Sequence, residues 1–357
     1  MKKIAIIFCS FILFLCVGVV GYFYISPFFF VVPENTDQVV IDDSTYISIT
    51  AVGDCTLGTD VNYGGWSSFE SEMAQVNYDY SYFLKLVKPF FENDDLTIAN
   101  FEGTLSNRGA RRDKEYAFRG NPEYVKVLTT SSVEAVNLAN NHTYDYGESA
   151  FSDTKNIMTE NGILWFEGNN CSITEIKGVK VGLVGINGLT YAGKTQFLKA
   201  IEKVKEQGAK LIIASIHWGE ERVETPNNEQ IKIAHSLVDN GADLVIGHHP
   251  HVLQGIEKYN GKYILYSLGN FCFGGHKNPA DKDTMIFKQD FQFKDGELTD
   301  YDSARVIPCS ISSVSERNNY QPKPLTEGDF ERVKAKIIDR SSGLSGMGNI
   351  MIMENFP

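Results

Sequence analysis

The sequence predicts a layered α/β fold with a mixed β-sheet. Apolar runs typical of strands alternate with segments of helical periodicity, as in Leu211 to Ile216 followed by the helix Glu229 to Asn240. Hairpin signals interrupt this alternation, and the strongest of them is Asn260-Gly261. Polar residues stand just past several of the apolar runs. Sheets of this class bind ligands beyond the carboxyl ends of their strands, so these polar positions are the first candidates for a site.

The composition limits the class of partner. The chain has 357 residues, of which 43% are hydrophobic and 22% charged, and this balance is typical of a globular protein. Its net charge of -12 argues against a nucleic-acid partner, because phosphate contacts require a clustered basic face. Two of the six cysteines lie in the N-terminal apolar run. The other four are widely spaced without a CxxC pair, which predicts small buried side chains and leaves a disulfide possible: Cys55, Cys171, Cys272 and Cys309.

The N-terminus predicts a membrane anchor. Lys2 and Lys3 precede an apolar run from Ile4 to about Tyr24, which continues weakly to Val32. Such a run is long enough to cross a bilayer, and the preceding positive charge places the N-terminus inside. A cleaved signal peptide is the alternative, but no small-x-small cleavage site follows. We therefore expect a single-pass anchor over residues 1–32, a linker over 33–45 and an extracytoplasmic domain behind it.

Three strands in the first half are followed by groups suited to metal binding. The strand Tyr46 to Val52 leads to Asp54, and the strand Leu96 to Ala99 leads to Glu102. A third strand, Glu134 to Leu138, is followed by Asn141, His142 and Asp145. A turn-forming aspartate and a helix N-cap are the ordinary explanations for single residues of this kind. They do not explain the recurrence.

Other segments of the first half have simpler interpretations. Tyr63 to Asn77 is rich in glycine, serine and aromatic residues and predicts a surface loop. An amphipathic helix is expected over Tyr82 to Glu92, because apolar residues recur there at helical spacing. Arg119, in a basic loop, could bind a carboxylate or phosphate, whereas a solvated surface charge is the usual role of such a residue.

The second half adds histidines at strand ends. His217 follows the strand Leu211 to Ile216, and three of the chain's seven histidines follow the strand Leu244 to Ile246, at His248, His249 and His251. Neutral imidazole is a common metal ligand, and an H-x-H pair can direct both rings into one pocket. Asn270 ends another polar loop. The remaining expected elements are helices over 122–129, 148–161, 196–207 and 328–340, strands over 164–167, 172–176, 179–186, 255–259, 262–267, 284–293 and 298–306, and a loose tail from Ser341.

Six of these segments together resemble a known family. GDCTLG, NFEGTL, NLANNHTYDYG, IHWGEE, GADLVIGHHPHVLQG and YSLGNFCFG, in that order, are similar to the CapA family of poly-gamma-glutamate capsule biosynthesis proteins. That family resembles the calcineurin-like metallophosphoesterases. The resemblance implies a four-layer αββα sandwich over residues 46–310, with a C-terminal extension over 311–357.

The resemblance also implies roles by position. The implied metal ligands are Asp54, Glu102, Asn141, His217, His249 and His251. His142, oriented by Asp145, would protonate the leaving group, and Arg119, His248 and Asn270 are candidates for substrate binding. One position departs from the metallophosphoesterase D-x-H motif, which here reads Asp54-Cys55-Thr56. His248 is a candidate to replace the missing histidine.

The implied function is hydrolysis with divalent metal ions. Carboxylate, amide and imidazole ligands suit two ions of Mn, Fe or Zn. We expect a membrane-anchored hydrolase of capsule biosynthesis that acts on an anionic envelope polymer. The alternative is a non-catalytic accessory protein that binds such a polymer and supports its synthesis or export beside a membrane polymer synthase.

Overall fold

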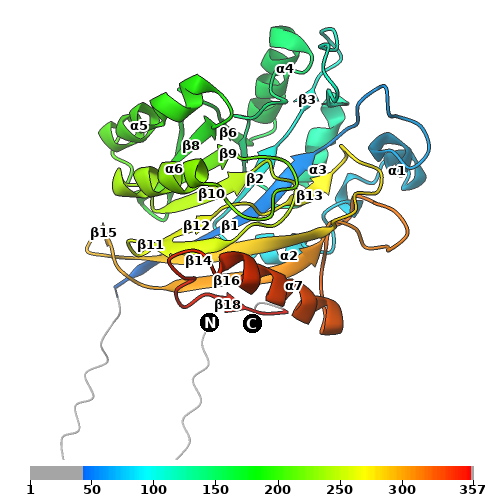
Figure 1. Ribbon diagram of the computed structural model, residues 1–357. Helices are drawn as coiled ribbons and strands as arrows, with labels where there is room; N and C mark the ends of the chain where they lie inside the picture. The colour runs from blue at the N-terminus through cyan, green and yellow to red at the C-terminus, as the bar shows by residue number, and fades with distance from the viewer. Residues whose placement is uncertain (1–42, 355–357) are drawn as a thin grey trace, which may run out of the picture. The chain divides into compact units, whose positions relative to one another are not determined.

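Two β-sheets packed face to face form the centre of the structure (Figure 1). The computed structural model describes residues 43–354. In the first sheet the strands follow the order β17 (Lys323–Pro324), β16 (Ser303–Ser310), β14 (Asp283–Lys294), β1 (Thr45–Thr56), β2 (Leu96–Phe101), β5 (Ala135–Asn137) and β6 (Leu164–Phe166). Three further strands pair with members of this sheet, β13 (Asn270–Phe273) with β1, β15 (Glu297–Leu298) with β14 and β18 (Met351–Ile352) with β16.

The second sheet is smaller and mostly parallel. Its strands follow the order β11 (Ile256–Tyr259), β12 (Lys262–Leu265), β10 (Leu244–His248), β9 (Leu211–His217), β8 (Val179–Asn187) and β7 (Ser172–Ile176). The expected hairpin at Asn260-Gly261 is confirmed: both residues have positive φ, 46° and 79°, as a two-residue turn between twisted strands requires. A separate short pair joins β3 (Thr104–Leu105) and β4 (Arg119–Gly120).

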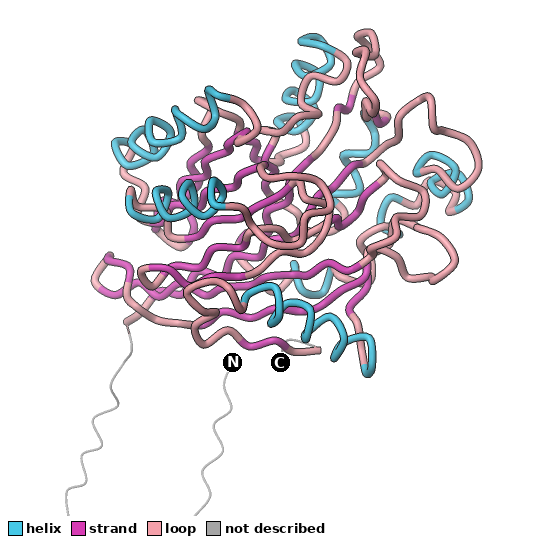
Figure 2. The backbone as a smooth tube through the Cα atoms, in the orientation of Figure 1, coloured by secondary structure: helices cyan, strands magenta, loops and turns pink. Residues whose placement is uncertain are grey.

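Helices cover the outer faces of both sheets, as the tube in Figure 2 shows. The helices α1 (Phe69–Gln75), α2 (Lys88–Phe91), α3 (Val125–Thr129) and α4 (Gly147–Glu160) lie on the first sheet, with the short 3₁₀ turns η1 (Tyr80–Tyr82) and η2 (Pro122–Tyr124) beside them. The helices α5 (Tyr191–Glu206) and α6 (Asn228–Asp239) lie on the second sheet, and α7 (Glu327–Ser341) packs against β11 and β16.

Three apolar clusters hold these layers together. The cluster between the sheets contains Ile49 and Ile98 of the first sheet and Ile213 and Ile246 of the second. Two outer clusters join each sheet to its helices. β2 and β10 are buried at every residue because both of their faces are covered, and most of their side chains are apolar. The order helix, sheet, sheet, helix agrees with the expected four layers.

Two expectations about the region between β1 and β2 are wrong. Residues 63–77 contain α1, which Ser68 caps and whose Phe69 and Met73 are fully buried. Burial of such side chains stabilises by about 1.5–3 kcal/mol each, which sustains a helix too short to be stable alone. The helix expected over Tyr82 to Glu92 is broken, because Pro89 cannot occupy a helix interior. α2 therefore begins at Lys88.

Two of the strands that were not expected lie where the sequence predicted loop or tail. Asn270 does not end a loop but opens β13, and the chain after Ser341 is not a loose tail, since β18 pairs with β16 through Arg305 and Met351. Both pairings join segments far apart in the chain.

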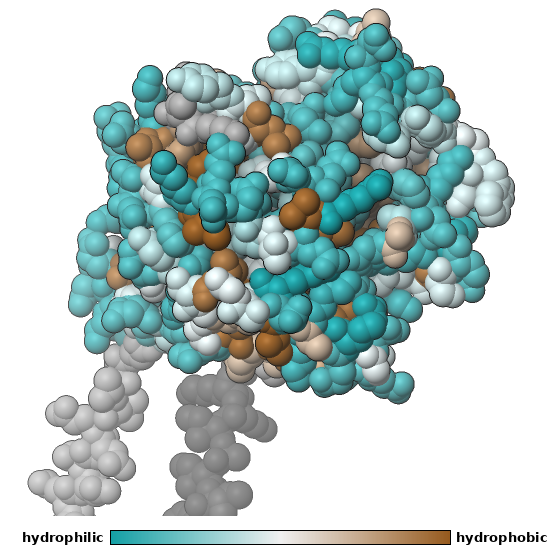
Figure 3. Space-filling model, in the orientation of Figure 1, coloured by the Kyte–Doolittle hydropathy of each residue, from teal (hydrophilic) through white to brown (hydrophobic). Residues whose placement is uncertain are grey.

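In the view of Figure 3 the surface is mostly hydrophilic, with apolar side chains in small separate groups.

The predicted anchor over residues 1–32 lies outside the described residues. Within residues 43–354, the helices are too short or too polar to cross a bilayer. The described cysteines form no disulfide: Cys55, Cys272 and Cys309 are buried and Cys171 is half-buried.

Candidate metal centre

The two sheets bring their strand ends to one place. Asp54 lies near the end of β1, and Glu102 directly follows β2. His217 and His248 are the last residues of β9 and β10 and stand opposite each other in the register of the second sheet. Asp54, His217 and His248 thus lie inside strands that extend further than the sequence predicted. The loops after β5 and β10 supply Asn141, His142, His249 and His251.

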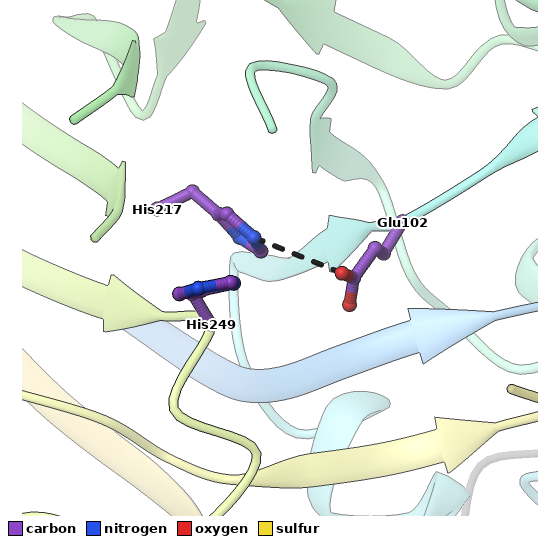
Figure 4. Close-up of side chains that lie close together, drawn as sticks. All are labelled: Glu102, His217 and His249. Carbon is purple, nitrogen blue, oxygen red and sulfur yellow. Dashed lines mark ion pairs between the residues drawn. The ribbon is translucent and has the colours of Figure 1, made fainter. Parts of the chain in front are cut away.

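Glu102 lies at the centre of this cluster. Its Oε1 is 3.5 Å from Nε2 of His142, 3.7 Å from Nε2 of His217 and 3.9 Å from Nε2 of His251. Figure 4 shows its carboxylate pointing toward the ring of His217, with His249 beside it. Both oxygens of Glu102 are buried and accept no hydrogen bond from any residue within 43–354. Burial raises the pKa of Glu102 to about 8, so its ionised form requires a positive charge close by, from a bound cation or from a protonated His251.

Both carboxylate oxygens of Asp54 contact neighbouring side chains or backbone. Its Oδ1 accepts a hydrogen bond from Nδ2 of Asn100 at 2.9 Å and lies 3.2 Å from Nδ1 of His248. Its Oδ2 lies 3.3 Å from Nδ1 of His251 and faces the backbone N–H of His249 at 3.4 Å. Burial opposes ionisation, but the adjacent imidazoles of His248 and His251 outweigh burial and hold the pKa of Asp54 well below its usual range. Asp54 is therefore a carboxylate at neutral pH.

Three groups of side chains could each hold a cation. They are Glu102, His217 and His249; Asp54, Glu102 and His251; and Glu221, His249 and His251. The first two groups share Glu102, as a carboxylate that bridges two ions would.

The charge states of the rings agree with this assignment. Burial, with the neighbouring His251, lowers the pKa of His249 to about 4, and burial lowers that of His217 well below its usual value. Both rings are therefore neutral, which is the form that coordinates metals. Burial also disfavours a charge on His251, but Glu102 and Asp54 outweigh it and raise the pKa of His251 to about 9. A positive charge is thus favoured beside the two carboxylates. The unpaired oxygens of Glu102 fit a cation at the same place.

The ligand loop after β10 has a strained backbone. His249 and His251 both have positive φ, 96° and 56°, which side chains other than glycine rarely adopt. Just before them, any side chain at Gly247 would meet the carbonyl oxygen of Tyr266 at 2.1 Å. Strained backbone of this kind clusters at functional sites, where the surrounding structure maintains it.

Three residues support His142. Its Nδ1 lies 2.6 Å from Oδ2 of Asp145, the expected partner, and the other oxygen of Asp145 accepts a hydrogen bond from Nζ of Lys114 at 2.8 Å. The ring of Phe118 stacks on the imidazole at 4.3 Å. Burial lowers the pKa of His142. This arrangement directs Nε2 of His142 toward the cluster. α4 has no side-chain cap, so the ordinary N-cap explanation for these polar residues does not hold.

An amide network that the sequence did not reveal lies behind the ligands. Oδ1 of Asn100 accepts hydrogen bonds from Asn137 at 3.2 Å and Asn140 at 3.4 Å, and its Nδ2 contacts Nδ1 of His217 at 3.3 Å as well as Asp54. Oδ1 of Asn141 lies 2.9 Å from Nε2 of His217. The one available signal was that polar Asn100 and Asn137 interrupt otherwise apolar strands.

The predicted substrate-binding residues lie in three different settings. His248 is 1% exposed and lies against Asp54, so it supports a ligand and is shielded from substrate. Asn270 lines the cavity beside the cluster, with its Oδ1 2.9 Å from Nδ1 of His251. Arg119 does not line that cavity: its guanidinium stacks on Tyr146 at 3.8 Å and donates to the carbonyl of Arg108.

The position of the missing motif histidine offers no replacement ligand. Cys55 packs in the apolar cluster between the first sheet and its helices, and burial raises the pKa of its thiol to about 12. The hydroxyl of Thr56 is buried without a hydrogen-bond partner among the described residues. The group of Asp54, Glu102 and His251 therefore has three side-chain ligands.

The fold and this cluster define a two-sheet α/β protein with groups that could hold a metal ion at the carboxyl ends of its strands. The family model described as bacterial capsule synthesis protein PGA_cap matches residues 48–275, and the chain belongs to this family. It is 31% identical to the PGA biosynthesis protein CapA of Bacillus subtilis over 67% of this chain and 66% of that protein. It is 30% identical to the capsule biosynthesis protein CapA of Bacillus anthracis over 83% of this chain and 74% of that protein.

Among solved structures, the calcineurin-like phosphoesterase YfkN of Bacillus subtilis aligns with a TM-score of 0.44 at 16% identity. The alignment covers 82% of this chain and 97% of that chain.

Proposed function

We propose that this member of the capsule synthesis family is a metal-dependent hydrolase that cleaves an anionic envelope polymer such as poly-gamma-glutamate. The observation that carries the proposal is Glu102, a fully buried carboxylate with no hydrogen-bond donor among the described residues and several imidazoles around it. A buried polar group without a partner needs compensation, and a divalent cation supplies it.

Different side chains would bind the ions and transfer the proton at such a site. Asp54, Glu102 and His251 would hold one ion, and Glu102, His217 and His249, with Asn141, would hold the other. Divalent ions of Mn, Fe or Zn, when bound, supply Lewis acidity toward an acyl or phosphoryl oxygen. To protonate the leaving atom, His142 would act as an imidazolium whose Nδ1–H donates to Asp145 and whose Nε2 carries the transferred proton, and the Asp145 carboxylate favours this charged form. Phe118 covers one face of this ring and excludes water from it.

The test compares two histidine variants of the full-length protein in detergent. We expect His142→Gln to lower kcat by about 10²–10⁴-fold toward a phosphodiester or poly-gamma-glutamate substrate, with metal content unchanged. His235→Gln is the matched control, since His235 stacks on Tyr259 and bonds Glu257 away from the cluster. Equal activity of His142→Gln and wild type, or a wild-type protein that binds no metal, would refute the proposal.

A non-catalytic accessory role is the second candidate. The observation that favours it is the departure at Thr56, which leaves one candidate ion with three side-chain ligands. In this case the protein would bind the polymer beside a membrane synthase without cleaving it. Affinity capture from membranes distinguishes the two: recovery of a synthase by an inactive but metal-bound protein favours the accessory role, and robust hydrolysis by the isolated protein excludes it.

We also propose that residues 1–32 anchor the protein in the cell membrane, with the domain outside. The apolar run and its flanking lysines support this. Protease added to intact protoplasts should digest the domain, whereas protection of the domain until lysis would place it inside.

A further inference from the structure

A cavity of about 540 Å³ opens beside the metal centre. His142, His251 and Asn270 line the end nearest the cluster, and Tyr116 and Phe118 form an aromatic wall. The rings of Tyr116 and Phe118 stack with their centroids 6.4 Å apart. A substrate whose reacting bond lies at the cluster would therefore extend into this cavity.

The charged groups of the cavity are unequally compensated. Glu224 pairs with Arg340 at 2.5 Å, and Asp281 pairs with Lys336 at 3.2 Å, so these two carboxylates are already neutralised. Glu221 belongs to one of the groups that could hold a cation. Arg222 is the one lysine or arginine among the residues lining the cavity, and its guanidinium has no hydrogen bond or ion pair with any residue in the part of the chain that the structure describes.

The backbone fixes Arg222 at this rim. Its φ is 64°, in the left-handed region, and its N–H donates to the carbonyl of Pro250 at 2.8 Å. The next carbonyl, that of Val223, accepts a hydrogen bond from the buried side chain of Gln254 at 2.8 Å, and Gln254 in turn accepts one from Gln230 at 3.0 Å. An unfavourable conformation held by buried partners at a cavity rim is typical of a functional position.

The charge of Arg222 affects a second residue that lines the cavity. Burial and, to a smaller extent, the charge of Arg222 lower the pKa of His276, another residue of the lining. Arg222 is exposed at the rim, and its charge acts on a group of the same cavity.

We infer that Arg222 is a specificity-determining residue that binds an oxyanion of the substrate away from the reacting bond, while the aromatic wall contacts the uncharged backbone beside it. The inference rests on the proposed function, because it assumes that the reacting bond lies at the metal cluster. A planar guanidinium without a protein partner binds a carboxylate through two parallel hydrogen bonds. The chemistry fits a polymer that carries one carboxylate on each unit, and a phosphate-bearing polymer is the other source of the same interaction.

The experiment measures binding by fluorescence anisotropy and does not require turnover. The full-length protein in detergent is titrated into a labelled oligomer of gamma-linked glutamate, and in parallel into the uncharged gamma-linked glutamine oligomer. We expect Arg222→Gln to weaken binding of the acidic oligomer by about 10–100-fold and Arg222→Lys to weaken it less. Binding of the uncharged oligomer should not change. Arg108→Gln is the matched control, because this exposed arginine pairs with Asp153 outside the cavity.

The outcomes separate this inference from the proposed hydrolase. Equal affinity of Arg222→Gln and wild type for the acidic oligomer, or no binding by wild type, overturns the role of Arg222 and leaves hydrolysis untouched. Arg222-dependent binding without any hydrolysis supports Arg222 and refutes the hydrolase. Competition by short polyphosphate that exceeds competition by unlabelled glutamate oligomer supports Arg222 as an oxyanion site and assigns phosphate as its ligand.

Discussion

The strands of the first sheet carry shielded carboxylates at both ends, but the two ends compensate them differently. At the carboxyl end, Glu102 accepts no hydrogen bond from a described residue. At the amino end, Glu134 accepts a bond from the backbone N–H of Thr97 at 2.8 Å, and Asp94 accepts one from the Thr97 hydroxyl at 2.7 Å. Burial raises the pKa of Asp94 to about 7 and that of Glu102 to about 8. A raised pKa is therefore common to both ends, whereas absent donors and surrounding imidazoles distinguish the candidate metal centre.

The largest effect is expected from removing the shared carboxylate. Glu102→Gln keeps the shape of the side chain but removes the charge that both candidate ions would share. We expect this variant to lose both ions, whereas His217→Asn should lose only one, because His217 belongs to a single group with Glu102. Elemental analysis of the purified proteins after dialysis against a metal buffer measures this.

The matched control lies at the other end of the same sheet. Glu134→Gln alters a carboxylate that already has a protein donor, so its metal content should equal that of wild type. Loss of metal in Glu134→Gln to the same extent as in Glu102→Gln would show that general destabilisation, and not ligation, explains the result.

A smaller effect is expected from the residues behind Asp54. Asn100→Ala removes the donor to Oδ1 of Asp54, and His248→Gln alters the ring beside the same oxygen. Residues that orient ligands typically change metal affinity by about 10–100-fold. We expect both variants to bind metal more weakly by this factor at unchanged stoichiometry, measured by competition with a chelator. Affinities equal to wild type would mean that Asp54 needs no support.

The comparison also explains which features the sequence could reveal. Asp54, Glu102, His217 and His249 each follow or end an apolar strand, and this local pattern predicted that they would meet, because parallel strands end at one edge. Most strands were predictable from the same local pattern, whereas the four layers were implied by the resemblance to a family. The resemblance to a family ordered these residues into a ligand set.

The residues that support the candidate ligands could not be predicted, because their contacts join segments that are far apart in the sequence. Asn100 appears in the sequence as a polar interruption of a strand, and Lys114 as one charge in a basic loop. Only the fold places Asn100 beside Asp54 and Lys114 beside Asp145. β13 was missed for the same reason, since its partner β1 lies more than two hundred residues earlier.

The smallest effect should come from the amino end of the sheet and concerns stability. The folded-state pKa of Asp94, about 7, lies above its ordinary value of 3.8. The group therefore contributes stability that is fully present below about pH 4 and is lost as the pH rises toward 7. Asp94→Asn stays neutral throughout, so its free energy of unfolding relative to wild type should rise across this window. Because Asp94 is only half-buried, we expect a gain of about 1–2 kcal/mol at pH 8.

Urea unfolding of both proteins at a series of pH values, with chelator present, measures this difference. Asp153→Asn is a control of opposite sign, because the bonds of Asp153 to Arg108 and Ser106 lower its pKa to about 2. Its contribution to stability is present above about pH 4 and disappears only as the pH falls through 2, so this variant should be less stable than wild type at pH 7. A difference for Asp94→Asn that stays constant from pH 4 to 8 would mean that the hydroxyl and backbone donors at the amino end compensate its charge fully. The two ends of the sheet would then differ even more than their pKa values indicate.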